Sequence, residues 1–344
     1  MTVHTHGFFH IIEKQYIDLS LFDTSYLPHQ IGGTPMKRAL ISLSALSIAT
    51  LPALAETQDF QVDSFSSIDV NGGIKVLYEP GAETSVIVEQ AEGDFSDISI
   101  KSDDGELQIS RESLGFLKSL RANLNVDLVD GDLRVKVNGK RKPSYTVIVT
   151  SPSISELDVA QSSILEASGI DAGEIELDSS SSGKLIVSGR AASADMDASS
   201  SSSIDASDFI AGAISIEATS SADVIAHAVT DSRARIDASS SSDVRLVLES
   251  TADVDVDASS STDVVLSGTC DEITVDASSS ADVEAKDLLC NSAEIEASSS
   301  ADVSVSVTEA LEAKASSGAD INVYGAPTQV DINESSGGDI SIKS

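Results

Sequence analysis

A segment of about 20 residues recurs along the second half of the chain, and this repeat limits the folds open to it. Each copy has an acidic residue, designated position 0, followed by a serine run, as in "VDASSSADV". Successive copies lie 18 to 20 residues apart, a spacing shorter than that of the common helical repeats. The repeat therefore predicts stacked copies of one structural unit. Position 0 is occupied by Asp158, Asp178, Asp197, Glu217, Asp237, Asp257, Asp276, Glu296, Lys314 and Asn333.

Apolar and polar residues alternate within each copy. Ile273, Val275 and Ala277 form one alternate set, and Thr274 and Asp276 stand between them. An extended chain with one buried and one exposed face gives this pattern. One such segment cannot enclose a core, but coils stacked about 4.8 Å apart can. The predicted fold is all-β: a right-handed parallel β-helix (β-solenoid) over residues 151–344, with about ten coils of about 20 residues.

The same alternation places the serine at position +3 on the buried face. Stacked hydroxyls can satisfy one another there, because each can donate to one neighbour and accept from the next. We therefore expect an inward ladder of serines, flanked by outward serines. The predicted ladder is Ser181, Ser200, Ser220, Ser240, Ser260, Ser279, Ser299, Ser317 and Ser336.

An aspartate recurs at position +6, on the predicted outward face. Stacked carboxylates repel one another, and calcium, which prefers oxygen ligands, would relieve that repulsion. The glycine-rich calcium nonapeptide of other solenoids is absent from the sequence, so hydration of the carboxylates is the alternative account. No other cofactor is expected. The candidate calcium column is Asp223, Asp243, Asp263, Asp282, Asp302, Asp320 and Asp339.

The two cysteines, Cys270 and Cys290, are one repeat apart, and each lies six places before its position 0. Stacked coils would bring their Cα atoms to about 4.8 Å, within the range of a disulfide. Two buried thiols that merely stack are the alternative. A zinc site lacks further ligands of the right kind nearby.

Composition and charge narrow the class of protein. The formal net charge is −35, of which residues 56–150 carry −7 and residues 151–344 carry −28. This excess excludes nucleic acid, or an anionic membrane, as a partner held by bulk charge. The chain has no Trp and only 4% aromatic residues, as suits a thin core of small β-branched side chains.

Residues 36–55, "MKRALISLSALSIATLPALA", have the basic start, apolar stretch and A-x-A ending of a secretory signal peptide. Cleavage is expected between Ala55 and Glu56. We interpret residues 1–35 as an upstream segment that follows from a wrongly assigned start, with a long leader as the alternative. The predicted destination is the periplasm, the cell surface or the medium, without a transmembrane segment in the mature chain.

Residues 56–150 form a β-rich part that is either a separate cap or the first coils. Its segments "FSSIDVNGGIKVLYEPG", "VIVEQ" and "DGELQIS", followed by the serine-rich repeats, resemble the auto-transporter adhesin head GIN domain family. The resemblance extends from about Phe60 to the end of the chain. It implies a β-helical, secreted or surface-located protein of poorly defined activity.

The favoured function is that of a non-catalytic, adhesin-like or structural protein with an acidic, serine-rich face. Its partner would be a surface ligand, glycan or protein, and end-to-end self-association is a further expectation. The alternatives are a calcium-stabilised or glycan-binding solenoid, a polysaccharide-processing β-helix enzyme and an ice-binding protein. An enzyme would need carboxylates converging with Arg, Lys or His in a groove. In residues 151–344 the lysines and arginines are scattered along the sequence, and His227 is the one histidine.

Overall fold

The computed structural model describes residues 56–91, 93–114, 123–129, 132–229 and 232–343. The signal peptide predicted at residues 36–55, the segment before it and the cleavage after Ala55 fall outside these residues and stay predictions. Apart from one 3-10 turn, η1 (Glu112–Leu114), the regular structure of the described residues is β-strand, which confirms the all-β class. No helix among them is long and apolar enough to cross a membrane.

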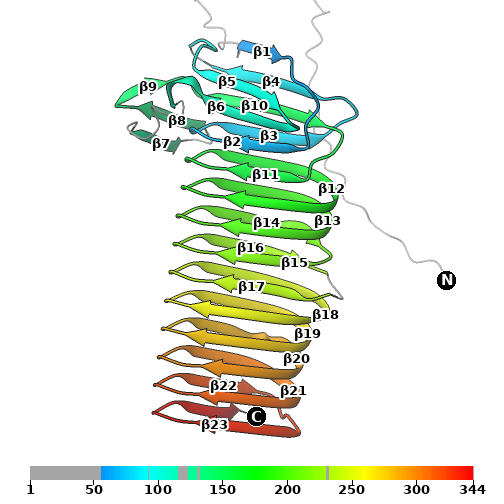
Figure 1. The fold of residues 1–344 in the computed structure, drawn as a ribbon, viewed down its shortest axis with the longest axis vertical. Coiled ribbons are helices and arrows are strands. Elements are labelled where there is room, and N and C mark those ends of the chain that lie inside the picture. The colour runs from blue at the N-terminus through cyan, green and yellow to red at the C-terminus, as the bar shows by residue number, and fades with distance from the viewer. Residues whose placement is uncertain (1–55, 92, 115–122, 130–131, 230–231, 344) are drawn as a thin grey trace, which may run out of the picture. The chain divides into compact units, whose positions relative to one another are not determined.

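The serine-rich repeats form a parallel β-solenoid of about nine turns, in which each coil pairs with the next (Figure 1). Position 0 aligns from coil to coil, from Asp158 with Asp178 to Lys314 with Asn333, so the predicted phase is confirmed. The right-handed winding and the exact number of coils stay predictions. The strands are β11 (Glu156–Val159), β12 (Ile164–Ser179), β13 (Lys184–Ala198), β14 (Ser203–Ala211), β15 (Ile214–Ala218), β16 (Asp223–Ala228), β17 (Ala234–Ala238), β18 (Asp243–Ser259), β19 (Asp263–Ser278), β20 (Asp282–Ala297), β21 (Asp302–Ala315), β22 (Asp320–Tyr324), β23 (Gln329–Glu334) and β24 (Asp339–Lys343).

The solenoid interior is filled by Val, Ile, Leu and Ala. Ile273, Val275 and Ala277 are buried, as the alternation predicts, and so are Val283 and Ala285 on the opposite strand of the coil. One continuous core cluster extends from Phe65 to Val323. The low aromatic content fits this geometry, because the closely facing strands are filled mainly by small and medium side chains, with Phe209 as the buried aromatic residue of β14.

Residues 56–151, called here the closing region, both begin the solenoid and cover its first coil. Strand β2 pairs in parallel with β11, and β3 with β12, so these two strands are a first coil. Strands β4 and β5 run antiparallel to β10 and β6, respectively, and a separate sheet of β7, β8 and β9 projects beside them (Figure 1). The bounds are β1 (Glu56–Phe60), β2 (Ser67–Val70), β3 (Lys75–Pro80), β4 (Ser85–Gln90), β5 (Ile98–Asp103), β6 (Glu106–Arg111), β7 (Leu124–Val129), β8 (Asp132–Val137), β9 (Lys140–Lys142) and β10 (Tyr145–Ser151).

A buried arginine joins the parts of the closing region. The Arg111 guanidinium donates to the carbonyl oxygens of Gly72, Gly73 and Pro143 at 2.6, 3.3 and 2.9 Å, and to the Asp97 carboxylate at 3.1 Å. Burial raises the pKa of Asp97, but hydrogen bonds from Ser113 and Arg111 and the nearby Lys142 charge outweigh it and leave that pKa lowered. The Arg111 side chain is fully buried, so its charge depends on these partners.

Candidate functional site

The serine runs form a sharp turn at one edge of the coils. The residues at positions +3 and +4 both have positive φ, between 50° and 64° for the serines, and from Ser181 onward both are exposed. Two successive residues with φ > 0 are the mark of a type I′ turn, in which the chain reverses within two residues. The amide at +4 donates to the +3 carbonyl of the next coil at 3.0–3.2 Å, as from Ser221 to Ser240, so the ladder continues through the turn.

The predicted inward serine ladder is therefore wrong. Ser181, Ser200, Ser220, Ser240, Ser260, Ser279, Ser299, Ser317 and Ser336 all point outward and are exposed. The strict alternation fails at position +3 alone, because the left-handed turn directs the residues at +3 and +4 to solvent, whereas positions +1 and +5, such as Ala277 and Ala281, are buried as the alternation predicts. We call the exposed serines at +3 and +4 the serine ridge: Ser181, Ser182, Ser200, Ser201, Ser220, Ser221, Ser240, Ser241, Ser260, Ser261, Ser279, Ser280, Ser299, Ser300, Ser317 and Ser336.

The buried hydroxyls lie at position +5 instead. Ser202 donates to the Ser179 carbonyl oxygen at 2.7 Å, and Ser242 donates to that of Ala218 at 2.9 Å. Thr262 likewise donates to the carbonyl oxygen of Ser259. Alternation puts position +5 on the inward face, but sequence reasoning missed its hydroxyls and the turn before it. A signal for the turn existed: position +4 of the last two coils is a glycine (Gly318 and Gly337), the residue that favours φ > 0.

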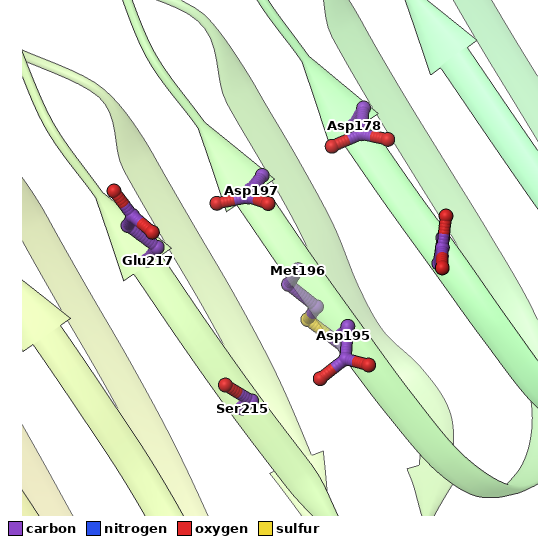
Figure 2. Close-up of a pocket in the computed structure, with 7 residues that line it drawn as sticks. Asp178, Asp195, Met196, Asp197, Ser215 and Glu217 are labelled. Carbon is purple, nitrogen blue, oxygen red and sulfur yellow. The ribbon is translucent and has the colours of Figure 1, made fainter.

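Two columns of outward residues beside the ridge, at positions 0 and −2, form a surface called here the acidic face. The residues of each column align from strand to strand, as Asp178 with Asp197 and Glu176 with Asp195. Figure 2 shows Asp178, Asp197 and Glu217 in one row and Asp195 and Ser215 in the other, around a shallow depression. In the described coils, cations enter these columns only as Arg235 and Lys314. The acids are Glu106, Asp69, Glu156, Asp158, Glu176, Asp178, Asp195, Asp197, Glu217, Asp237, Asp255, Asp257, Asp276, Glu294, Glu296, Glu312 and Asp331.

Burial, together with the crowding of the acids, raises the pKa of two aspartates near the start of the solenoid. Burial, followed by the negative charges of Asp69 and Asp178, raises the pKa of Asp158 to about 6. Burial and the charge of Asp197 raise the pKa of Asp178 to about 6 as well. Farther along, Lys314 contacts Glu296 at 2.8 Å and Glu312 at 3.1 Å. The densest unpaired negative charge of the face therefore lies over β2 and β11–β15.

The aspartates at position +6 stack on the other side of the ridge, as the repeat predicts. Asp223, Asp243, Asp263, Asp282, Asp302, Asp320 and Asp339 align from coil to coil. Burial and the neighbouring Asp223 raise the pKa of Asp243. Among the described residues, no three His, Cys, Asp or Glu side chains converge as metal ligands would. The calcium hypothesis stays a prediction.

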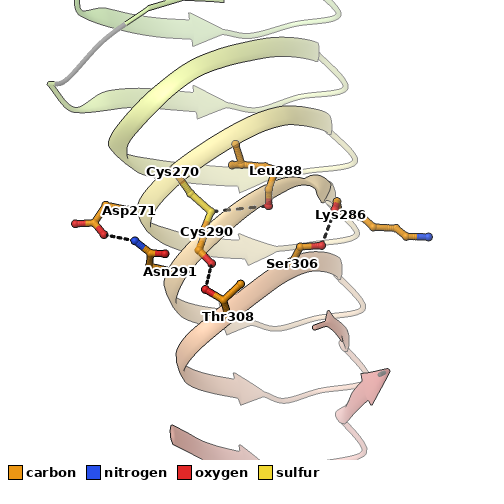
Figure 3. Close-up of a disulfide and its surroundings, with 8 residues drawn as sticks. All are labelled: Cys270, Asp271, Lys286, Leu288, Cys290, Asn291, Ser306 and Thr308. Carbon is orange, nitrogen blue, oxygen red and sulfur yellow. Dashed lines mark hydrogen bonds between the residues drawn. A yellow bond between two sulfur atoms is a disulfide. The ribbon is translucent and has the colours of Figure 1, made fainter. Parts of the chain in front are cut away.

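The cysteines lie on the remaining side of the coils, which carries neither the acidic face nor the aspartates at position +6. Cys270 and Cys290 are aligned on β19 and β20 and are joined by a disulfide, with Cα atoms 4.5 Å apart (Figure 3). Next to them, Asn291 donates to the Asp271 carboxylate at 2.8 Å. His227 lies 3.4 Å from Glu249. It is the only histidine of the described residues.

A parallel solenoid with long ladders of similar polar groups along its coils belongs to the class of β-helical repeat proteins. The family described as "Putative auto-transporter adhesin, head GIN domain" matches residues 64–246 and 225–327, and the chain belongs to this family. The resemblance inferred from the sequence is thereby confirmed. No curated protein matches the chain.

Solved bacterial structures are also similar to the chain. A protein described as a putative lipid binding protein, from Parabacteroides distasonis ATCC 8503, is 16% identical; the match covers 84% of this chain and 97% of that one, with a TM-score of 0.44. A putative adhesin from Parabacteroides merdae ATCC 43184 is 12% identical over 84% and 96%, with a TM-score of 0.43. Another from Bacteroides fragilis NCTC 9343 is 14% identical over 84% and 97%, with a TM-score of 0.27.

Proposed function

We propose that the chain is an exported, non-catalytic adhesin that binds glycan chains along its serine ridge and acidic face. The observation that carries the proposal is the pairing of two ladders: exposed hydroxyls at every turn, beside a row of carboxylates at the same spacing. Hydroxyls both donate and accept, and carboxylates accept, so together they match the hydroxyl groups of sugars. Membership of an adhesin family supports a place at the cell surface or outside the cell.

The repeat and the charge both bear on the kind of glycan. Equivalent groups recur about every 4.8 Å along the stack, so a polymer can engage several coils at once and gain affinity through multivalency. The net charge of −35 disfavours anionic polysaccharides and favours neutral or amino-sugar polymers. For amino sugars, affinity would fall as salt rises, whereas neutral sugars would show little salt dependence.

A glycan-binding screen on the full exported chain tests the proposal. The triple variant Ser200→Gly, Ser220→Gly and Ser240→Gly removes three ridge hydroxyls while keeping a backbone that glycine adopts freely, so binding should fall without loss of folding. Asp178→Asn with Asp197→Asn should weaken binding of amino sugars. The matched control is Asp271→Asn with Asp287→Asn, two exposed carboxylates on the disulfide side. Binding that survives both ridge and face variants would refute this assignment of the site.

A further inference from the structure

The last coil leaves an apolar edge open. Strands β23 and β24 pair with β21 and β22 on one side, and no described strand pairs with their other side. Val330, Ile332 and Ile342 continue the buried columns of the preceding coil, yet their exposed fractions are 46%, 46% and 44%. Strands β23 and β24, with these three side chains, are called here the open end. An unpaired strand edge with exposed apolar residues is a template for another β-structure.

Among the described residues, the opposite end of the solenoid shows no comparable cluster: its exposed large apolar side chain is Leu128, on the separate sheet of β7, β8 and β9. There the closing region folds over the first coil, and the apolar residues that it packs against the core, such as Phe65, Val86 and Ile98, are buried. Head-to-tail stacking would therefore place an apolar edge against a covered one. Two copies meeting at their open ends would instead bury the same side chains on both, as an interface with two-fold symmetry requires.

The sequence of β24 fits such symmetry. If Ser341 lies on the two-fold axis, the antiparallel strands place Asp339 opposite the partner's Lys343 and Ile340 opposite the partner's Ile342. Repulsion within the position 0 column also ends here, because that position changes from acids to Lys314 and Asn333 in the last two coils. We propose that the open end is the interface through which two copies of this chain associate head to head.

One residue limits the strength of this association. Glu334 stands in the inward column where the preceding coil has Ala315, and it accepts a hydrogen bond from the Ile340 amide at 2.9 Å. Pairing of the two open ends would enclose both Glu334 carboxylates, and inward charges are a common means of blunting strand edges. The association is therefore expected to be reversible and dependent on concentration.

A cysteine placed on the predicted axis tests the register. In the full chain, Ser341→Cys should bring two equivalent side chains within about 5 Å and give a covalent dimer on oxidation. The native cysteines are joined to each other, so they leave no competing thiol among the described residues. Ser304→Cys is the matched control, because Ser304, Asn322 and Ser341 belong to one outward column and Ser304 lies two coils from the open end. It should give no dimer. Equal cross-linking of both variants, or none at Ser341→Cys, would overturn the register.

Sedimentation velocity over a range of concentrations tests the association itself. Ile332→Lys with Ile342→Lys should raise the dissociation constant about tenfold or more, whereas Glu334→Ala should lower it by about as much. Leu289→Lys, at an equally exposed leucine on the side of the coils, is the control and should change nothing. Circular dichroism verifies that each variant is folded. A chain that is monomeric at all concentrations, or whose dimer survives the double lysine variant, would refute the proposal.

Discussion

The closing region and the solenoid share one core but are stabilised in different ways. In the solenoid, each buried column repeats nearly the same contact in every coil, such as Val254, Ile273 and Ala293 in successive strands. The closing region depends on contacts that occur once. Its buried tyrosines each have a specific partner: Tyr145 donates to the Asp94 carbonyl oxygen, and Tyr78 meets the Ser151 hydroxyl.

The comparison shows how repetition distributes stability. A repeat array is stabilised mainly by contacts between neighbouring coils, and a defect in one coil leaves equivalent contacts elsewhere. A unique network such as that of Arg111 has no equivalent. We therefore expect single substitutions to destabilise one region without the other when they fall in the closing region, and to be partly compensated by equivalent contacts when they fall in the solenoid.

The largest effect is expected from a charge buried in the middle of the solenoid. Val275→Asp replaces a fully buried side chain and should lower the free energy of unfolding by about 5 kcal/mol. Thr274→Asp, one residue away on the exposed face, should change it by less than about 0.5 kcal/mol. Urea unfolding of both variants provides the measurement. Similar destabilisation of the two would contradict the inward and outward assignment.

Removal of the buried arginine should test the closing region alone. Arg111→Met removes the donor of three carbonyl groups and one of the partners of the Asp97 carboxylate, which keeps Ser113 and Lys142, and about 3–5 kcal/mol of stability should be lost. Hydrogen exchange should show the loss of protection concentrated in β2–β6 and β10, with the later coils retained. Arg134→Met, at an exposed arginine on β8, is the control. Uniform loss of protection along the chain would mean that the two regions unfold as one unit.

Loss of the disulfide should have a somewhat smaller effect. Cys270→Ala with Cys290→Ala opens a loop with a sequence separation of 20 residues, and the free energy of unfolding should fall by about 3 kcal/mol. Mass spectrometry of the unreduced exported protein determines whether the bond forms. Two alkylatable thiols in that protein would contradict both the bond and the expected loss.

Substitutions in the serine ridge should raise or lower the free energy of unfolding, depending on how readily the new residue adopts a positive φ. Ser240 has a φ of 59°, which strains residues with a side chain by about 1–2 kcal/mol, and glycine avoids this strain at some entropic cost. Ser240→Gly should therefore raise the free energy of unfolding by about 0.5–1 kcal/mol. Ser240→Val should lower it, because β-branched residues disfavour φ > 0. Stabilisation by valine would contradict the left-handed turn.

The smallest effect concerns pH and the acidic face. The pKa values of Asp158 and Asp178 are about 6 in the folded chain, above the ordinary value of 3.8, so the folded state binds protons more tightly than the unfolded state. Stability should consequently fall as pH rises from about 4 through 6 and stay lower above that range. Asp158→Asn with Asp178→Asn should reduce this dependence and raise the melting temperature at pH 7. The prediction is contradicted if the melting temperature of the unmodified chain rises between pH 5 and 7 and that of the variant does not.

Sequence periodicity alone determined the register of the solenoid. The position 0 residues from Asp158 to Asn333 align as their spacing predicts, and the apolar residues around Asp276 are buried as their alternation predicts. The same spacing placed Cys270 beside Cys290. These features follow from the sequence because a coil that repeats every 18 to 20 residues must place equivalent residues next to each other, whatever the details of its turns.

The direction of the serines was decided by the tertiary structure. Alternation applies to a straight strand, and it cannot show where the chain bends; at Ser279 and Ser280 two left-handed residues turn the chain, and the column predicted to be buried faces solvent. The antiparallel pairings of β4 and β5 and the contacts of Arg111 were likewise beyond the sequence pattern. They join residues far apart in a region without a repeat, and only the folded chain determines which of the many available strand pairings forms.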